Sequence, residues 1–213
     1  MMDKGFVLDQ KRMPIAPKDV AAAVAFLRRD RHLGPVAQAQ PRPVLGMRSR
    51  PFNSLIVAIA GQQISRTAAG AIMRRLDALA PMPFTAEELA KLRLPQLRGA
   101  GLSASKAACV AACARAFLAE DRLLRLGRLP DDEVREALTA IKGVGPWTAE
   151  MVLMFGLGRQ DVMPHGDVGI IRGAARAFGT KDMERAAARL RTTAPKWAPY
   201  RTVAAAYLWN LAA

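Results

Sequence analysis

Apolar residues along most of the chain fall into short segments that could each form one buried face of a helix, whereas no long run alternates apolar and polar residues. Alternation with period two would be needed for a half-buried strand, because successive strand side chains point to opposite faces. Alanine, leucine and arginine, which favour helices, dominate the same segments. The pattern therefore predicts a fold built almost entirely of helices.

Several of these segments begin with a residue whose side chain can accept hydrogen bonds from the unpaired backbone N–H groups of a first helical turn. Asn53 and Ser65 precede two apolar segments that are separated near Gly61, Gln62 and Gln63. The last apolar segment covers residues 200–213. We predict helix starts at Pro17, Asn53, Ser65, Thr85, Ser103, Asp131, Pro146, Asp167 and Asp182.

Residues 34–51 form a proline-rich and basic segment between the first two predicted helices. Proline interrupts helices, so this segment is predicted to be a loop or a domain hinge. We therefore divide the chain into residues 1–50, a helix and connector that pack on the core, and residues 51–213, which form the core.

A strong positive charge accompanies this helical pattern. The 213 residues carry a formal net charge of +14 at a sequence pI of about 11.0, and 51% of them are hydrophobic, enough to fill a core. A polyanion such as nucleic acid is the favoured partner. The alternative is a solvated basic surface that only aids solubility.

The sequence contains little that indicates a metal site, a cofactor site or a membrane-spanning segment. Cys109 and Cys113 are spaced to share one helix face and are interpreted as core residues, and His32 and His165 lie too far apart for a zinc motif. The first residues lack the apolar region of a signal peptide, and no apolar run reaches about 18 residues. We expect an intracellular monomer, cytoplasmic and nucleoid-associated, without cofactor or membrane partner.

Residues 138–150 are predicted to form a hairpin of two helices around the turn IKGVGP. Both glycines of this turn can take positive φ, its valine can anchor the turn in the core, and proline suits a first helical position. Backbone amides at a helix N-terminus converge on one place, which fits a DNA phosphate without sequence readout. A plain glycine-capped turn is the alternative. The predicted backbone contacts are Lys142, Gly143, Val144, Gly145 and Thr148.

The segment IKGVGPWTA, with Asp167 placed 22 residues after Gly145, resembles the helix-hairpin-helix signature of a DNA glycosylase superfamily. AGQQIS at 60–65 is similar to the junction that carries a residue wedged into DNA, and WAPYRTVAAAYLW resembles the closing helix of the 3-methyladenine DNA glycosylase II branch. The resemblance covers roughly residues 50–213. It implies an all-α fold, with two helical subdomains flanking an active-site cleft, in a short form without an N-terminal β domain or an iron–sulfur cluster.

The resemblance gives Asp167 a catalytic role. A glycosidic bond breaks through an oxocarbenium-like transition state, and a fixed carboxylate near C1′ stabilises the positive charge that develops there. The alternative for Asp167 is an ordinary helix cap. Because no second carboxylate is conspicuous beside it, we expect an alkylated base, which is already cationic and leaves without a general acid.

Trp147 is the leading candidate to stack on such a cationic base, the alternative being a structural aromatic beneath the hairpin. In superfamily members that also cleave the strand, a lysine at this position forms a Schiff base with the sugar. This chain has tryptophan there, so we predict base excision without strand cleavage. Met151, one helical turn later, lines the pocket or, as we favour, packs in the core.

Other roles rest mainly on the resemblance. Trp197 supports or lines the base pocket, and Arg201 makes a structural ion pair or a phosphate contact. Gln63, with Ile64 as the next choice, is the candidate to fill the space left by an extruded base, a simple helix break being the alternative. The remaining candidates are a second phosphate site at Ser103 and Lys106 and a monovalent ion at the carbonyl groups of Thr139, Ile141 and Gly143.

Two classes of function remain open. The first is a monofunctional glycosylase that hydrolyses 3-methyladenine or 7-methylguanine type bases from damaged double-stranded DNA, as the first step of base excision repair. The second is a non-enzymatic helix-hairpin-helix DNA-binding module, which needs the hairpin but has no use for Asp167. Within the enzyme class, an oxidised or mismatched base is a further alternative.

Overall fold

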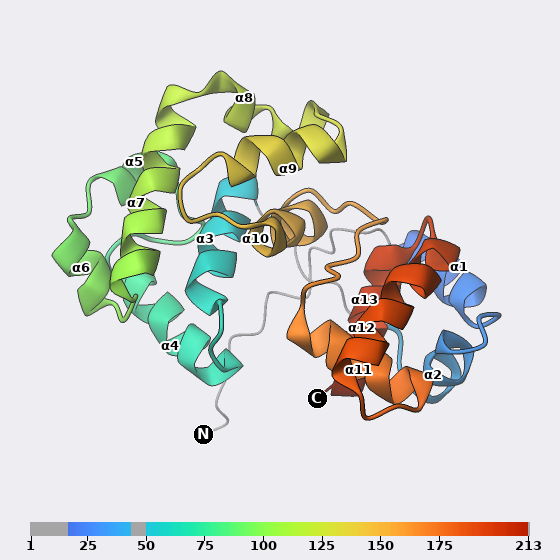
Figure 1. The fold of residues 1–213 in the computed structure, drawn as a ribbon. Helices are drawn as coiled ribbons and strands as arrows, with labels where there is room; N and C mark the ends of the chain where they lie inside the picture. The colour runs from blue at the N-terminus through green and yellow to red at the C-terminus, as the bar shows by residue number, and fades with distance from the viewer. Residues whose placement is uncertain (1–16, 44–49, 213) are drawn as a thin grey trace. The chain divides into compact units, whose positions relative to one another are not determined.

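A computed structural model describes residues 17–43 and 50–212 of the chain (Figure 1). The described residues form helices and contain no strand, which confirms the predicted all-α fold. Predictions that concern residues 1–16 and 44–49, including part of the expected connector, lie outside the described residues. The described part divides into two compact helical units, here called unit 1 and unit 2.

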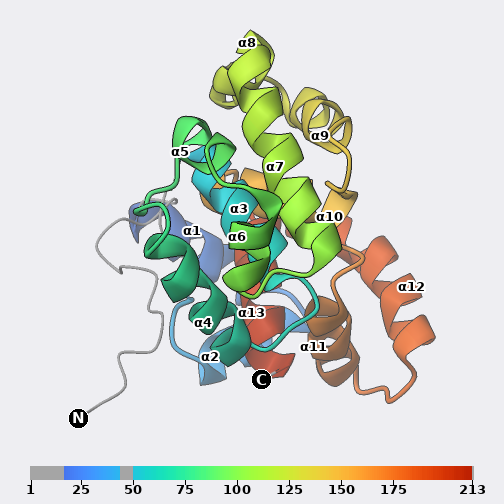
Figure 2. The ribbon, with the colours of Figure 1, turned by 90° about the vertical axis from the view of Figure 1, so that its left-hand side faces the viewer.

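Unit 1 comprises the described residues from 50 to 157. Its centre is the apolar helix α3, whose buried residues pack against α4, α7, α10 and η2. Helix α7 also packs against α5 and α6 (Figure 2). The elements are α3 (Pro51–Gly61), α4 (Arg66–Asp77), α5 (Ala86–Ala90), α6 (Leu94–Gly99), α7 (Ala104–Ala119), α8 (Asp121–Leu124), η1 (Leu126–Arg128), α9 (Asp131–Thr139), α10 (Pro146–Met151) and η2 (Val152–Gly156).

Unit 2 comprises the described residues 17–43 and 158–212. Helix α13 forms its centre and packs against α1, α2, α11 and η3. The approach of α11 to α13 depends on Gly173, because a Cβ at this position would lie 1.9 Å from the carbonyl oxygen of Leu208. The elements are α1 (Pro17–Leu27), α2 (Leu33–Ala39), α11 (Val168–Phe178), α12 (Met183–Thr193), η3 (Ala194–Trp197) and α13 (Arg201–Ala212).

The N-terminal helices α1 and α2 pack in the same compact unit as the C-terminal helices. Helices α1 and α2 bury apolar residues such as Leu27 and Leu33 completely and contact α13. Helix α2 lies in the segment that the sequence analysis assigned to a loop, and that assignment is wrong for residues 34–39. Pro35 stands in the first turn of α2, where a missing N–H costs no helical hydrogen bond.

Most predicted helix starts are confirmed by a capping hydrogen bond. The side chains of Ser65, Thr85, Ser103, Asp167 and Asp182 each accept a hydrogen bond from a backbone N–H in the first turn that follows. The predicted start at Asn53 is wrong, because α3 begins at Pro51 and the Asn53 side chain instead accepts a hydrogen bond from the N–H of Phe84. The predicted break near Gln62 and Gln63 is confirmed, since α3 ends at Gly61.

Candidate functional site

The hairpin in unit 1 joins α9 to α10 through a turn whose first glycine is required by the fold. Gly143 has φ of +94°, a left-handed conformation, and a Cβ there would lie 2.9 Å from Sγ of buried Cys109. Val144 is 6% exposed and its N–H donates to the carbonyl of Ile141, as expected for a residue that anchors the turn in the core. Lys142 is exposed beside the turn.

The second glycine of the turn, Gly145, does not have the positive φ that the sequence allowed for both glycines. Gly145 has φ of −98° and ψ of 173°, an extended conformation that any residue can adopt, because it is the N-cap of α10. A Cβ at this position would meet no atom of the protein within 4 Å. The fold therefore leaves open space in front of the α10 N-terminus, where the first backbone N–H groups have no intrahelical partner.

Three predicted residues lie on α10. Trp147 is half-buried at its second position. Thr148 is 1% exposed, and its Oγ1 accepts a hydrogen bond of 2.8 Å from Nε2 of Gln62, so the hydroxyl makes a protein contact in place of the expected DNA contact. Met151 is 6% exposed, which agrees with the favoured reading of a core residue.

The segment expected to fill the DNA stack lies between α3 and α4. Gln63 is exposed and has φ of +56°, and Ile64 is 38% exposed. The Lys106 ammonium donates to the carbonyl oxygens of Ala60 and Gln62, at 3.0 and 2.7 Å. The structure thus joins Lys106, predicted as a phosphate contact, to the segment predicted as the wedge.

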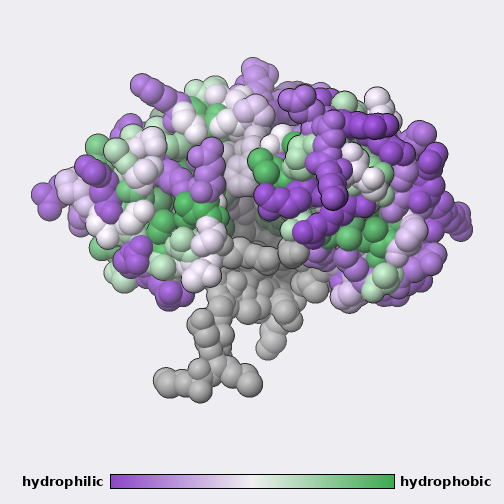
Figure 3. All heavy atoms as spheres, turned by 60° about the horizontal axis from the view of Figure 1, so that its bottom comes forward, coloured by the Kyte–Doolittle hydropathy of each residue, from purple (hydrophilic) through white to green (hydrophobic). Residues whose placement is uncertain are grey.

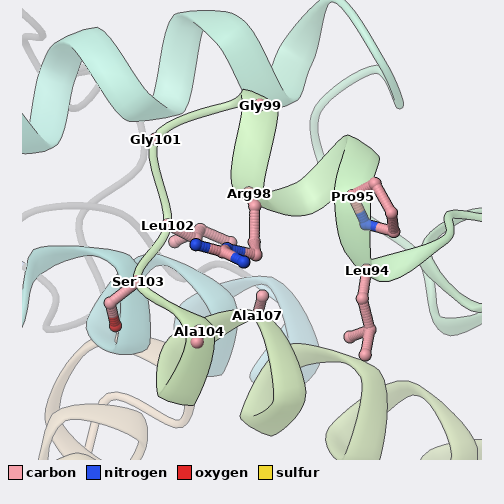
Figure 4. Close-up of a pocket in the computed structure, with 9 residues that line it drawn as sticks. All are labelled: Leu94, Pro95, Arg98, Gly99, Gly101, Leu102, Ser103, Ala104 and Ala107. Atoms are coloured by element: carbon pink, nitrogen blue, oxygen red, sulfur yellow. The ribbon is translucent and has the colours of Figure 1, made fainter.

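The second predicted phosphate site consists of Lys106 and the N-terminus of α7 at Ser103. Ser103 caps this 16-residue helix by accepting the N–H of Lys106, and its Oγ lies 3.0 Å from Oγ of Ser105. An open groove with a volume of about 810 Å³ runs between this N-terminus and α6 (Figure 4). Leu102 and the exposed Arg98, both drawn as sticks in Figure 4, are among the residues that line this groove.

In unit 2, Asp167 is held by two hydrogen bonds from different helices. Its Oδ1 accepts the N–H of Ile170 at 2.8 Å, as the N-cap of α11, and the indole N–H of Trp209 from α13 at 2.9 Å. A Cβ on Gly169 would lie 3.0 Å from this oxygen and 3.0 Å from Cδ1 of Trp209. The carboxylate is therefore oriented by contacts that leave little room for a side chain at position 169.

The sequence did not indicate that Trp209 contacts Asp167. The two residues stand 42 positions apart, and the packing of α11 on α13 brings them together. Only the closing-helix pattern, which ends on this tryptophan, pointed to the segment. Val168, directly after Asp167, is 61% exposed, so one apolar side chain is exposed next to the aspartate in the chain.

The loop that leads to Asp167 is fastened to the start of α13. The guanidinium of Arg201 forms an ion pair with Asp161, with Nε to Oδ1 at 2.6 Å and Nη2 to Oδ2 at 2.9 Å. These hydrogen bonds lower the pKa of the Asp161 carboxyl below its usual value. Buried Thr202 adds bonds to the backbone of Arg159 and Val162. Of the two alternatives for Arg201, the structure shows the ion pair.

Near this loop, His165 is partly buried and Trp197 is fully buried. His165 has a buried Nδ1 without a hydrogen-bond partner, and burial followed by the charges of Arg201 and Arg191 lowers its pKa. Trp197 has no exposed surface, and η3 packs it against α12 and α13. A side chain in this position supports its surroundings and does not line a surface that a base could reach.

The structure also bears on the predicted ion site and on membrane-spanning helices. No group of three His, Cys, Asp or Glu side chains in residues 17–43 and 50–212 could hold a metal ion. The Ile141 carbonyl, one of three predicted ligands for a monovalent ion, accepts the N–H of Val144 but retains a second lone pair, so that site stays a prediction. None of the described helices is long and apolar enough to cross a membrane. One face of the surface mixes hydrophilic and hydrophobic residues (Figure 3).

Known proteins are similar to this chain in both sequence and fold. The family profile described as "HhH-GPD superfamily base excision DNA repair protein" matches residues 56–199. DNA-3-methyladenine glycosylase 1 of Schizosaccharomyces pombe is 35% identical over 177 residues, 79% of this chain and 76% of the relative.

Solved structures agree with this assignment. The 3-methyladenine DNA glycosylase of Schizosaccharomyces pombe, in complex with abasic DNA, has a TM-score of 0.78 at 31% identity, over 89% of this chain and 95% of that chain. The DNA-3-methyladenine glycosidase of Bacillus halodurans has a TM-score of 0.73 at 36% identity, over 94% and 91%. The chain, with its glycine turn and its oriented aspartate, belongs to the HhH-GPD superfamily of base excision DNA repair proteins.

Proposed function

We propose that this protein is a monofunctional DNA glycosylase that hydrolyses the N-glycosidic bond of alkylated purines, of the 3-methyladenine and 7-methylguanine type, in duplex DNA. The observation that carries the proposal is the Asp167 carboxylate, fixed by the Ile170 N–H and the Trp209 indole. A DNA-binding module has no need of such a carboxylate. Relatives of similar length are named for 3-methyladenine excision, which supports the same substrate class.

Asp167 acts on the sugar of the damaged nucleotide. As the bond from C1′ to the base lengthens, positive charge develops on the sugar ring, and a carboxylate held in place stabilises that charge without reorganising. The base leaves with the bonding electron pair, and water adds to C1′ and loses a proton. Two hydrogen bonds to Oδ1 fix the carboxylate before the substrate arrives.

The damaged base is recognised by its charge and its aromatic face. A purine alkylated at a ring nitrogen carries a positive charge, which an indole face attracts. Trp147 is our candidate for this stacking, and its place in the hairpin, where strand-cleaving members carry lysine, supports excision without strand cleavage. The hairpin backbone around Gly145 holds the DNA backbone, and the base is extruded to reach the pocket.

The decisive variant is Asp167→Asn, because asparagine is as good a helix cap as aspartate and keeps an oxygen that accepts both N–H groups. Parent and variant are incubated with methylated duplex DNA, and the released bases are quantified by chromatography. We expect the variant to fold and bind DNA but to release 3-methyladenine or 7-methylguanine about 10²- to 10³-fold more slowly. Strands that stay intact without alkali support the absence of lyase chemistry.

Two results would overturn the proposal. If the parent releases no base from alkylated DNA while it binds the duplex, the binding-module alternative takes its place. If it releases only an oxidised or mismatched base, the glycosylase class stands and the alkylpurine assignment fails.

A further inference from the structure

The loop 62–65, between α3 and α4, contains a backbone conformation that its sequence does not favour. Gln63 has φ of +56° and is the one residue other than glycine with positive φ in the part of the chain that the structure describes. This left-handed conformation costs a residue with a Cβ about 1–2 kcal/mol. Such a conformation persists only where surrounding contacts fix it.

Lys106 supplies the first of these contacts. It projects from the first turn of α7, and its ammonium donates to the carbonyl oxygens of Ala60 and Gln62, at 3.0 and 2.7 Å. The last carbonyl groups of a helix have no intrahelical partner, so a cation at this end of α3 is stabilising. Lys106 is partly buried, and this burial lowers the pKa of its ammonium.

Gln62 supplies the second contact. Its Nε2 donates to Oγ1 of Thr148 at 2.8 Å, and Thr148 is buried on α10. Gln62 is therefore held twice, through its carbonyl by Lys106 and through its side chain by Thr148. The next two residues, Gln63 and Ile64, are exposed. These bonds also tie the loop to the second helix of the hairpin.

We propose that Lys106 and Gln62 are positioning residues that hold Gln63 and Ile64 ready to fill the space left by an extruded base. This inference rests on the proposed function, because only an enzyme that extrudes a base needs a side chain in the vacated stack. A loop already in its working conformation loses no further entropy when DNA binds, so the filling residue stabilises the extruded state more. Lys106 thus acts inside the protein and not on a phosphate.

The first test compares Lys106→Met with the matched control Lys91→Met, which removes one exposed charge from the same unit. Excision of an alkylated purine is measured from a paired duplex and from a duplex in which the same base stands opposite an abasic site. We expect Lys106→Met to lower kcat on the paired duplex about 10-fold and on the unpaired one less than about 3-fold, since an unpaired base is easily extruded. Equal losses on both substrates would overturn the proposal.

The second test separates positioning from phosphate binding. A lysine that contacts a phosphate contributes about 0.9 to the slope of log Kd against log salt. We expect Lys106→Met to keep the slope of the Lys91→Met control, because Lys106 is bonded to Ala60 and Gln62. A slope reduced by about 0.9 relative to that control would identify a phosphate contact.

The third test needs no excision and therefore stands apart from the proposed function. Amide hydrogen exchange is followed over residues 61–66 in the parent, in Lys106→Met and in Gln62→Ala, which removes only the bond to Thr148. We expect exchange in this loop to become about 10-fold faster in both variants and to stay unchanged elsewhere in unit 1. Unchanged loop exchange in both variants would overturn the positioning role even if the parent excises bases. Faster loop exchange in the variants, together with a parent that excises no base, would refute the proposed function and leave the positioning of the loop standing.

Discussion

The two glycines of the hairpin turn should respond to the same substitution in opposite ways. In Gly143→Ala, the new Cβ must occupy a left-handed conformation at φ of +94° and lie 2.9 Å from Sγ of Cys109. The backbone strain costs about 1–2 kcal/mol. Overpacking against a buried side chain adds about 1–3 kcal/mol. We expect a loss of stability of about 2–4 kcal/mol, which lowers Tm by about 5–15 °C in a protein of this size.

In Gly145→Ala, the new Cβ enters open space on an extended backbone. Alanine restricts the unfolded chain and gains about 0.4–1 kcal/mol, while it is a poorer N-cap than glycine by a similar amount. We therefore expect Tm to change by less than about 2 °C. If the DNA backbone approaches the turn at this point, the methyl group will clash with it and raise Kd for duplex DNA about 10-fold, which corresponds to about 1.4 kcal/mol.

The assay combines thermal unfolding with fluorescence anisotropy on a duplex that contains an abasic analogue. Gly99→Ala serves as the control, because a Cβ at Gly99 also meets no atom within 4 Å and Gly99 lies outside the hairpin. The predicted approach of the DNA backbone to Gly145 is refuted if Gly145→Ala binds DNA as tightly as the Gly99→Ala control. The expected small change in Tm is refuted if Gly145→Ala unfolds as early as Gly143→Ala.

Three further perturbations test unit 2. Trp209→Phe removes the indole N–H from Asp167, and we expect kcat for base release to fall about 10-fold with little change in Kd for DNA, measured by single-turnover kinetics. Asp161→Asn should cost about 1–2 kcal/mol, seen as a lower Tm, because it breaks a half-buried ion pair. Burial, followed by the charge of Arg189, lowers the pKa of His32 below 6.5. The unfolded chain therefore takes up this proton first, and stability should fall as pH drops below about 6.5. In His32→Gln this part of the fall in Tm between pH 7.5 and 5.5 should be absent, and an unchanged pH profile would refute the assignment.

Local features of the sequence predicted local features of the fold. Ser65, Thr85 and Asp182 were recognised as helix caps because a cap depends on a side chain and the three residues that follow it. The glycine turn and the aspartate likewise follow short patterns. Asn53 misled the prediction because its side chain bonds to Phe84, 31 residues away, a partner that no local pattern reveals.

The long-range contacts that hold the proposed functional groups could not be predicted from the sequence. The sequence predicts Lys106 as a phosphate contact because a helix N-terminus with a lysine beside it can bind phosphate. Its observed partners are instead carbonyl groups 44 and 46 residues earlier in the chain. The Trp209 indole meets Asp167 across 42 residues, and Gln62 meets Thr148 across 86. A sequence motif can identify a residue proposed to face the substrate. The residue that orients this side chain lies on another helix, and only the tertiary packing shows which one.

The contacts that hold the 62–65 loop lie in unit 1 and those that hold Asp167 lie in unit 2, so each set of contacts can be tested separately. In unit 1, the bonds of Lys106 and Gln62 fix a strained loop, and their loss should affect extrusion of a paired base more than the chemistry. In unit 2, the bond from Trp209 fixes the Asp167 carboxylate, and its loss should slow chemistry on paired and unpaired bases alike. A double variant, Lys106→Met with Trp209→Phe, should therefore show additive losses on the paired duplex, because the two residues act on different steps of the reaction. Losses that are not additive would mean that the loop and the carboxylate are energetically coupled.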